Sequence, residues 1–239
     1  MAGSIADYRK MVEQPWGKMF YEQINAQLVL PTDKKLKILD FGAGFCITSA
    51  YLSKYHDVTT AEPNEEMYGV RVEGDYTLIT RGAEYLTEIP DNTYDVVICH
   101  NVLEYVEDRD AILKELGRVL KSGGKLSIIK HNVFGRALAM AVFGDDPKGA
   151  LNLLSGEAED SMFGNRDVYP NEYLTEFFDS SMKLENVFGI RAFFGLSKNN
   201  DIKYTDDWYT NMLELENKVC SMDEYKKIAF FNHLIFCKN

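Results

Sequence analysis

The chain has 239 residues, of which 46% are hydrophobic and 26% charged, and its formal net charge is −11. This length and composition are typical of one globular α/β domain with a substantial core. No apolar run reaches the ~18–20 residues that a membrane span needs, and the polar segment Met1–Tyr21 does not resemble a secretory leader. The acidic charge opposes nonspecific binding to nucleic acid or to an anionic membrane. We therefore expect a cytoplasmic protein that makes no use of a membrane.

The cysteines are too few and too widely spaced to suggest cross-links. Cys46, Cys99, Cys220 and Cys237 form no CxxC pattern. Reduced thiols are the simplest interpretation, and we expect neither disulfides nor a metal site.

Strand-like and helix-like patterns alternate through the first half of the chain, which favours a mostly parallel, twisted sheet with helices on both faces. The expected strands are Lys37–Phe41, Val58–Ala61, Tyr76–Ile79, Tyr94–His100 and Gly124–Lys130, and the expected helices are Phe45–Lys54, Glu65–Arg71 and Asp110–Leu120. Residues 1–30, which precede the first strand, are expected to form a helical lid.

Residues 132–168 break this alternation. They are rich in Gly, Ala, Phe and Met without a clean period, and we expect a helical cap over the carboxyl edge of the sheet. Regular elements are expected again at Pro170–Asp179 (helix), Lys183–Gly189 (strand), Asp206–Cys220 (helix) and Ile228–Cys237 (strand). Because no repeat or low-complexity linker interrupts the chain, residues 1–239 are predicted to form a single domain.

A glycine turn follows the first strand. The run Leu36–Phe41 contains Asp40 and leads into Gly42 and Gly44, after which a helical pattern starts. Such a turn lets backbone approach a ligand closely at a helix N-terminus. Glu62 ends the second strand, at a distance along the chain that suits a carboxylate accepting hydrogen bonds from ribose hydroxyls. The pattern predicts a site for a cofactor that contains a nucleoside.

The turn lacks the third glycine of nicotinamide and flavin sites, where Ile47 stands instead. A large aliphatic side chain there argues against a diphosphate, whereas S-adenosylmethionine has no phosphate. We therefore expect S-adenosylmethionine. Three alternatives stay open: a turn with no ligand, a nucleotide-dependent oxidoreductase, and a non-catalytic module that binds an adenosine cofactor.

A second block extends the pattern. Tyr94–Asp108 continues to the stretch Arg118–Leu126, which contains R-V-L-x-x-G-G. With these blocks, residues 36–131 resemble the class I S-adenosylmethionine-dependent methyltransferases, and the resemblance implies a Rossmann-like fold.

A narrower resemblance is to the tRNA 5-carboxymethoxyuridine methyltransferase family. The stretches that carry it are Trp16-Gly17-Lys18, His100 with Val102-Leu103-Glu104, Leu126-Ser127, Asn132, Gly189–Phe193, and Leu213–Glu216 with Cys220. It implies that a methyl ester forms on the carboxylate of a modified wobble uridine in tRNA. The acidic charge keeps a second acceptor open, namely a small molecule such as a carboxylic acid or a quinone-like metabolite.

Four residues of the first two strand ends are expected to bind the cofactor. Gly42 and Gly44 would pass beneath its methionine and ribose portions, Asp40 would order the loop or bond the amino group through water, and Glu62 would bind the ribose diol. The plain structural alternatives are a tight turn for the glycines and solvated strand ends for the acids.

Three more residues are expected at the cofactor, and the resemblance implies the first two. It implies that Ala83 offers its backbone N–H to the adenine, with Glu84 beside it, although Glu84 can equally be a surface carboxylate. His100, at the end of the fourth strand, is expected to contact the cofactor and to take part in catalysis, the alternative being a polar strand cap.

Arg166 and Arg191 are the candidates for binding an anionic acceptor, because a guanidinium grips a carboxylate or phosphate with two parallel bonds. Arg191 is also assigned to catalysis, and either arginine can instead be a surface ion pair. A carboxylate acceptor is already ionised and needs no base; any other acceptor would require one, from His100 or His131. Tyr8, Trp16 and Tyr21 are candidates for an aromatic lid, and His233 is expected in the core.

Overall fold

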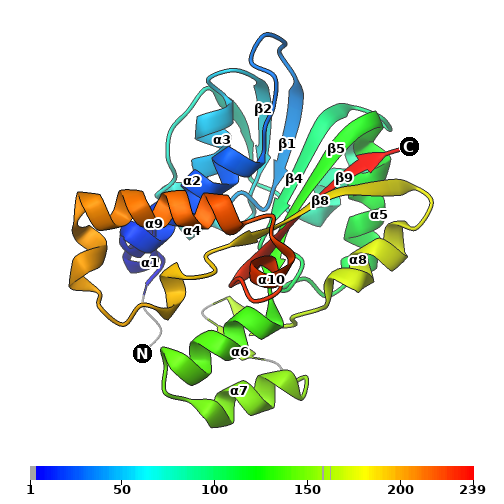
Figure 1. Ribbon diagram of the computed structural model, residues 1–239. Coiled ribbons are helices and arrows are strands. Elements are labelled where there is room, and N and C mark those ends of the chain that lie inside the picture. The colour runs from blue at the N-terminus through cyan, green and yellow to red at the C-terminus, as the bar shows by residue number, and fades with distance from the viewer. Residues whose placement is uncertain (1–3, 158, 162) are drawn as a thin grey trace.

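The structure, a computed structural model, describes residues 4–157, 159–161 and 163–239. Its centre is a seven-stranded sheet in the order β3-β2-β1-β4-β5-β9-β8 (Figure 1). The strands of this sheet are β1 (Lys37–Phe41), β2 (Asp57–Ala61), β3 (Tyr76–Ile79), β4 (Tyr94–His100), β5 (Leu120–His131), β8 (Met182–Ile190) and β9 (Phe231–Lys238). β1 to β5 pair in parallel, and β9 runs antiparallel to β5 and β8. The predicted α/β fold with a mostly parallel sheet is confirmed.

Helices cover both faces of this sheet. The helices of the described residues are α1 (Ile5–Val12), α2 (Pro15–Gln27), α3 (Ile47–Leu52), α4 (Glu65–Gly69), α5 (Arg109–Val119), α6 (Val133–Val142), α7 (Pro147–Leu154), α8 (Asn171–Phe178), α9 (Asp206–Val219) and α10 (Asp223–Lys226), with short 3-10 turns η1 (Ala83–Glu88), η2 (Phe194–Leu196) and η3 (Asp201–Tyr204). None of the helices in these described ranges is long and apolar enough to cross a membrane.

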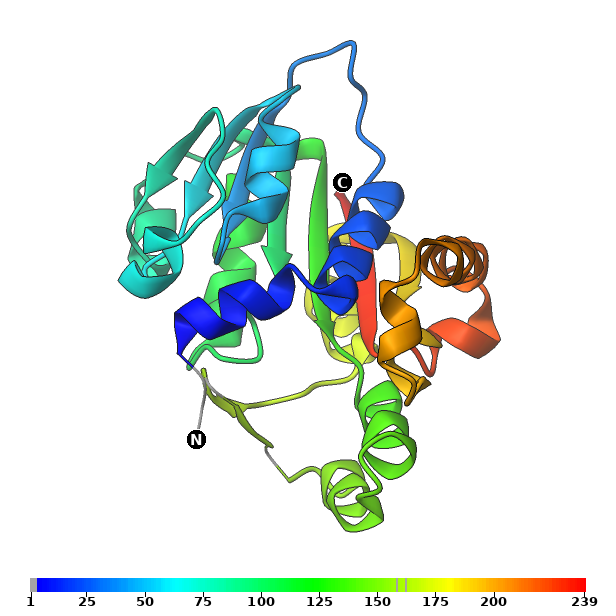
Figure 2. The same cartoon turned by 90° about the vertical axis from the view of Figure 1, so that its left-hand side faces the viewer.

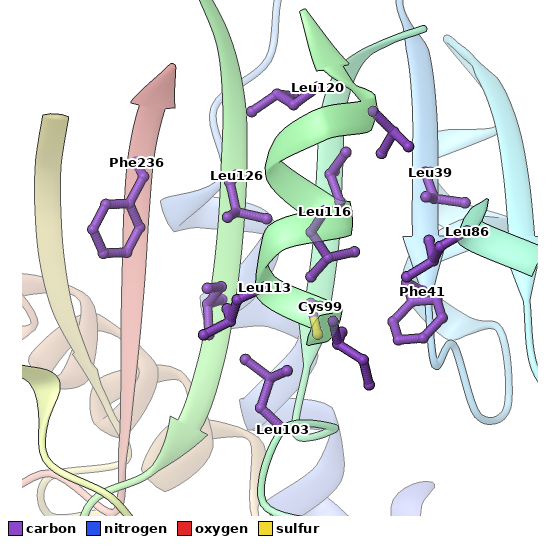
Figure 3. Close-up of a cluster of buried hydrophobic side chains, with 14 of the residues drawn as sticks. Leu39, Phe41, Leu86, Cys99, Leu103, Leu113, Leu116, Leu120, Leu126 and Phe236 are labelled. Carbon is purple, nitrogen blue, oxygen red and sulfur yellow. The ribbon is translucent and has the colours of Figure 1, made fainter. Parts of the chain in front are cut away.

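The largest hydrophobic cluster lies between the sheet and helix α5. Ile112, Leu113 and Leu116 recur at the spacing that places side chains on one helical face, and they pack against Leu39 and Leu126 of the strands (Figure 3). On the opposite face, α2 packs through Phe20 and Ile24 against Ile129, Ile190 and Phe231. The N-terminal segment thus contributes α2 to the helical layer on this face of the sheet.

Several element boundaries differ from the sequence expectation. The expected helix Phe45–Lys54 corresponds to the shorter α3. This helix begins only at Ile47 because Cys46 has a left-handed backbone with φ of 56°. Strand β5 begins at Leu120 instead of Gly124, and β9 begins at Phe231 instead of Ile228.

The segment 132–168 is only partly helical. α6 follows directly after β5, so it lies beyond the carboxyl end of the parallel strands together with α7 (Figure 2). An antiparallel hairpin then pairs β6 (Glu159–Ser161) with β7 (Gly164–Arg166), which the sequence pattern did not predict.

Asp40 is buried at the end of β1 and joins three elements. Its Oδ2 accepts a hydrogen bond of 2.6 Å from the hydroxyl of Ser49 in α3, and that hydroxyl accepts one of 2.7 Å from Thr60 in β2. Burial raises the pKa of Asp40 from 3.8 to about 6; the bond from Ser49 opposes this shift, and the nearby Glu62 adds to it.

The raised pKa predicts a pH-dependent stability. The fold favours protonated Asp40, so the free energy of unfolding falls as pH rises through the folded pKa, by on the order of 3 kcal/mol between pH 4 and pH 8. Asp40→Asn removes this loss, and its stability relative to wild type should therefore increase over the same range. Urea unfolding at pH 4, 6 and 8 measures the difference. A difference that is constant with pH would show that Asp40 ionises normally in the fold.

Candidate functional site

The glycine turn at the end of β1 has the left-handed backbone that glycine favours. φ is +72° at Gly42 and +56° at Gly44, and a Cβ on Gly42 would lie 2.3 Å from Val102 Cγ2. The N–H groups of Gly42 and Ala43 both donate to the carbonyl of Ala61 at the end of β2. The turn therefore packs closely between the ends of β2 and β4, where any side chain at Gly42 would collide.

Glu62 holds this turn from the neighbouring strand. Its Oε2 accepts a 2.7 Å bond from the N–H of Gly44, and its Oε1 accepts a 2.8 Å bond from the N–H of Asn64. Burial raises its pKa, and the two backbone bonds oppose the shift. Each carboxylate oxygen keeps a second lone pair, so the group can accept hydroxyl donors without releasing the turn.

The next strand end brings Gly82 beside this carboxylate region. A Cβ on Gly82 would lie 3.8 Å from Pro63, the residue after Glu62. Ala83 opens η1 and is exposed. Glu84 is exposed as well; its Oε1 accepts from the N–H of Gly82 at 3.1 Å, and Arg81 lies 3.6 Å away. The structure thus places Ala83 and Glu84 at the same edge as Glu62, with Glu84 bonded to its own loop.

His100 ends β4 and is half-buried. Its Nε2 lies 2.8 Å from the hydroxyl of Ser127, which is 2.7 Å from Nε2 of His233. Burial lowers the pKa of His100 well below its ordinary value, and the neighbouring His233 adds to this shift. His100 is therefore a neutral ring at neutral pH. His233 is fully buried in the sheet, as expected.

Arg191 lies directly after β8 in an aromatic enclosure. Its guanidinium carbon is 5.1 Å from the ring centre of Phe230, 5.5 Å from that of Trp16 and 5.6 Å from that of Phe194. Its Nε is buried and has no hydrogen-bond partner among the described residues. Burial lowers the pKa of Arg191 to about 10, so the guanidinium stays charged at neutral pH.

The backbone around Arg191 is held by two buried polar side chains. Arg191 has a φ of +60°, a conformation that costs a residue with a side chain about 1 kcal/mol. Its N–H donates to Oε1 of Gln23 in α2. The carboxylate of Glu216 in α9 accepts from the N–H groups of Ala192, Phe193 and Phe194 at 2.8, 2.9 and 2.8 Å. The loop is therefore fixed before any ligand binds.

Arg166 reaches the same region from β7. Its Nε donates to the hydroxyl of Tyr105 at 2.8 Å. Tyr8 of α1 lies close enough to Arg166 and Arg191 for both charges to lower its pKa, although burial raises that pKa more strongly. The ring of Tyr8 also contacts Phe45, next to the glycine turn, with centroids 5.5 Å apart. Tyr8 thus lies between the glycine turn and the two arginines.

Three residues that the sequence analysis did not assign are prominent here. Gln23 and Glu216 hold the Arg191 loop, and Asn101, with a φ of 55°, follows His100. Nε2 of Gln23 and Oδ1 of Asn101 are buried without a partner among the described residues. Unpaired buried polar atoms are costly, so they indicate a place for a polar ligand. The local sequence offered no signal for Gln23, which lies in an ordinary amphipathic helix.

His131, the second candidate base, is occupied. Its Nδ1 lies 3.1 Å from Oε1 of Glu104, which also accepts the backbone N–H of His131 at 2.7 Å. Burial lowers the pKa of His131 to about 4 despite that carboxylate. In the described ranges, no group of three or more His, Cys, Asp or Glu side chains is arranged to hold a metal ion, and the four cysteines are free.

Comparison with known proteins gives these features a family. Residues 39–128 match the model of the methyltransferase domain. The chain is 22% identical over 235 residues to the tRNA 5-carboxymethoxyuridine methyltransferase of Escherichia coli K12, covering 90% of this chain and 85% of that protein. It is 29% identical over 155 residues to the ubiquinone/menaquinone biosynthesis C-methyltransferase of Shewanella woodyi, covering 57% of this chain and 61% of that protein. The chain thus spans about three-fifths of the length of this quinone relative.

A solved structure with the same fold covers nearly the whole chain. It is described as an S-adenosylmethionine-dependent methyltransferase, possibly acting on histamine, from Thermotoga maritima; its TM-score is 0.62 at 15% identity, over 98% of this chain and 96% of that one. At this identity the likeness shows the fold alone. The domain match, the sheet order and the glycine turn together identify residues 39–128 as a class I S-adenosylmethionine-dependent methyltransferase domain, whose cofactor is S-adenosylmethionine.

Proposed function

We propose that the chain transfers a methyl group from S-adenosylmethionine to a carboxylate, and that this carboxylate belongs to a modified wobble uridine of tRNA. The observation that carries the proposal is the charged, aromatic-enclosed guanidinium of Arg191, whose Nε is buried without a partner among the described residues. A buried cation with an unused donor is suited to a planar anion.

The residues at the strand ends fit the cofactor. We propose that the remaining lone pairs of Glu62 accept the ribose hydroxyls and that the backbone approaches the cofactor closely at Gly42 and Gly44. Asp40 would support the turn through its bond to Ser49. Ala83 and Glu84 are assigned to the adenine end. Gln23 and Asn101 offer one unpaired donor and one unpaired acceptor for the polar groups of the methionine end. His100 lies between this end and the acceptor.

When bound, S-adenosylmethionine supplies an electrophilic methyl group on a positively charged sulfur. The acceptor carboxylate is ionised at neutral pH and has no proton to lose, so the protein's task is alignment and exclusion of water. Arg191 and Arg166 would orient the carboxylate, and the rings of Tyr8 and Trp16 would shield it. The N-terminal α1 would act as the lid, and the segment 132–168 as a cap. Arg191 would be catalytic because it orients the reacting carboxylate.

The relatives favour a tRNA acceptor, and the charge favours a small one. The tRNA methyltransferase of E. coli aligns along 90% of this chain, including the loop of Arg191, whereas the quinone methyltransferase aligns along 57%. The net charge of −11 opposes the approach of a polyanion, so a small carboxylic acid or a quinone-like metabolite is the second candidate. A tRNA acceptor agrees with the cytoplasmic location expected from the sequence.

Mass spectrometry of tRNA nucleosides decides between these acceptors. A strain without the gene is compared with its parent and with the deletion strain that carries the gene on a plasmid. Loss of a methyl ester at the wobble uridine, accumulation of the free carboxylate and restoration by the plasmid are expected. An unchanged nucleoside profile would overturn the tRNA assignment and leave the small molecule.

Glu62→Gln should weaken binding of S-adenosylhomocysteine by about 1–3 kcal/mol, the scale for losing hydrogen bonds to a charged group. The amide cannot accept from both Gly44 and Asn64, and it offers the ribose fewer lone pairs. Isothermal titration calorimetry measures the change. Glu185→Gln, which removes an acid paired with Lys125 on β5, is the matched control and should bind as wild type does. Equal affinity of the two variants would remove Glu62 from the site.

Arg191→Ala should lower kcat/KM for the acceptor by an amount equivalent to about 2–5 kcal/mol, because a desolvated anion loses its partner. Affinity for S-adenosylhomocysteine should stay nearly constant. Arg191→Lys should retain more of the wild-type kcat/KM than Arg191→Ala but not all of it, since an ammonium lacks the planar fork of donors of a guanidinium. Lys125→Ala controls for the loss of one positive charge from an acidic protein. Equal steady-state kinetics for all four proteins would contradict an anionic acceptor at Arg191.

A further inference from the structure

We propose that Gln27, His233 and Ser127 are positioning residues that fix the proton of His100 on Nε2 and present its Nδ1 lone pair to the cofactor and acceptor site. They form one continuous chain of hydrogen bonds from α2 through β9 and β5 to β4. The distances are 2.9 Å from Gln27 to His233, 2.7 Å from His233 to Ser127 and 2.8 Å from Ser127 to His100.

Gln27, at the end of the hydrogen-bond chain farthest from His100, determines which group donates and which accepts in each bond. Nε2 of Gln27 donates to the carbonyl of Gly189 at 3.1 Å, and a carbonyl can only accept. The amide is thereby oriented, so its Oε1 faces Nδ1 of His233 as an acceptor. Nδ1 of His233 must therefore carry a proton.

The next two protons follow from the neutrality of His233. Its ring is fully buried beside Phe188, His100, Ser127 and Gln27, and no carboxylate of the described residues forms an ion pair with it. A neutral ring with a proton on Nδ1 offers Nε2 as an acceptor, so the hydroxyl of Ser127 donates to it. The oxygen of Ser127 then accepts from Nε2 of His100, which places the proton of His100 there.

The opposite direction would require a charged ring in the core. If Ser127 donated to His100 instead, Nε2 of His233 would also have to donate, and His233 would be a buried imidazolium. Burial lowers the pKa of His233 to about 3, which leaves the ring neutral. One proton arrangement therefore remains.

This arrangement determines what His100 can do. Its Nε2 is bonded to Ser127, whereas Nδ1 has no hydrogen bond to another described residue, so Nδ1 is the ring nitrogen left for a ligand. The residue that carries this nitrogen lies at the end of β4, in register with Ile129 of β5 and next to Asn101 in the sequence. A lone pair there accepts an N–H or O–H of a bound ligand and cannot donate to a carboxylate. This last step rests on the proposed function, whereas the proton arrangement does not.

Nitrogen NMR of the histidine side chains tests the arrangement directly. In the long-range proton–nitrogen spectrum of the full chain, His100 should show a protonated Nε2 and a bare Nδ1, and His233 the reverse. His100→Gln and His233→Gln variants assign the two signals. Addition of S-adenosylhomocysteine should shift the Nδ1 resonance of His100. A proton on Nδ1 of His100 would overturn the proposal, and binding heat without any shift at Nδ1 would overturn its second half.

Gln27→Glu tests the hydrogen-bond chain, because it should reverse the donor and acceptor roles between His233, Ser127 and His100. A carboxylate beside Nδ1 stabilises an imidazolium on His233, which then donates to Ser127, and the hydroxyl proton of Ser127 turns to His100. The proton of His100 should move to Nδ1, and affinity for S-adenosylhomocysteine should fall about 3- to 10-fold, the effect of one lost hydrogen bond. In a Ser127→Ala background the same change should leave His100 unaltered, because the hydroxyl that links the two histidines is missing. If Gln27→Glu does not fold, the wild-type spectrum alone decides. Absence of methyl transfer would challenge the proposed function without altering these spectra.

Discussion

Two buried carboxylates hold the two halves of this site, and each accepts at least one backbone N–H from a loop that contains a left-handed residue. Glu62 accepts from Gly44 and Asn64 at the cofactor end, and Glu216 accepts from three successive residues after Arg191. A left-handed residue turns neighbouring N–H groups toward one side, which makes a concavity for an anion. An internal carboxylate supplies that anion permanently, so the loops keep their shape without a ligand.

In the proposed function, the acidic surface and the arginine site affect different steps of acceptor binding. A net charge of −11 lowers the rate at which a polyanion approaches, and this effect weakens as salt screens it. In the proposed function Arg191 would act after contact, inside an enclosure of aromatic rings where screening is small. A tRNA acceptor is therefore compatible with an acidic protein if the modified nucleoside is recognised mainly through its own carboxylate. The same enclosure would accept a small carboxylic acid for the same reason.

The sequence was sufficient for most strands of the sheet, although not for the β6–β7 hairpin, and for the closeness of Glu62 to the glycine turn. Lys37–Phe41, Tyr76–Ile79 and Tyr94–His100 form the strands that their patterns predict, because hydrophobic periodicity is a local property. Parallel strands end at one edge, which brings Glu62 to the glycine turn. Glu216 and Gln27 could not be assigned this way. Gln27 and His233 are 206 residues apart in the sequence, and their hydrogen bond depends on how α2 packs against β9.

Helix α2 shows how much of the chemistry depends on such packing. Gln23 and Gln27 are one turn apart, so both project from the same face of the helix, and both are buried. Gln23 accepts from the backbone of Arg191, while Gln27 orients His233 and, through it, His100. A small rotation of α2 would disturb both contacts at once, because a helix moves as a rigid unit. The helix expected to be only part of a lid therefore connects the arginine that would orient the acceptor to the histidine at the cofactor end.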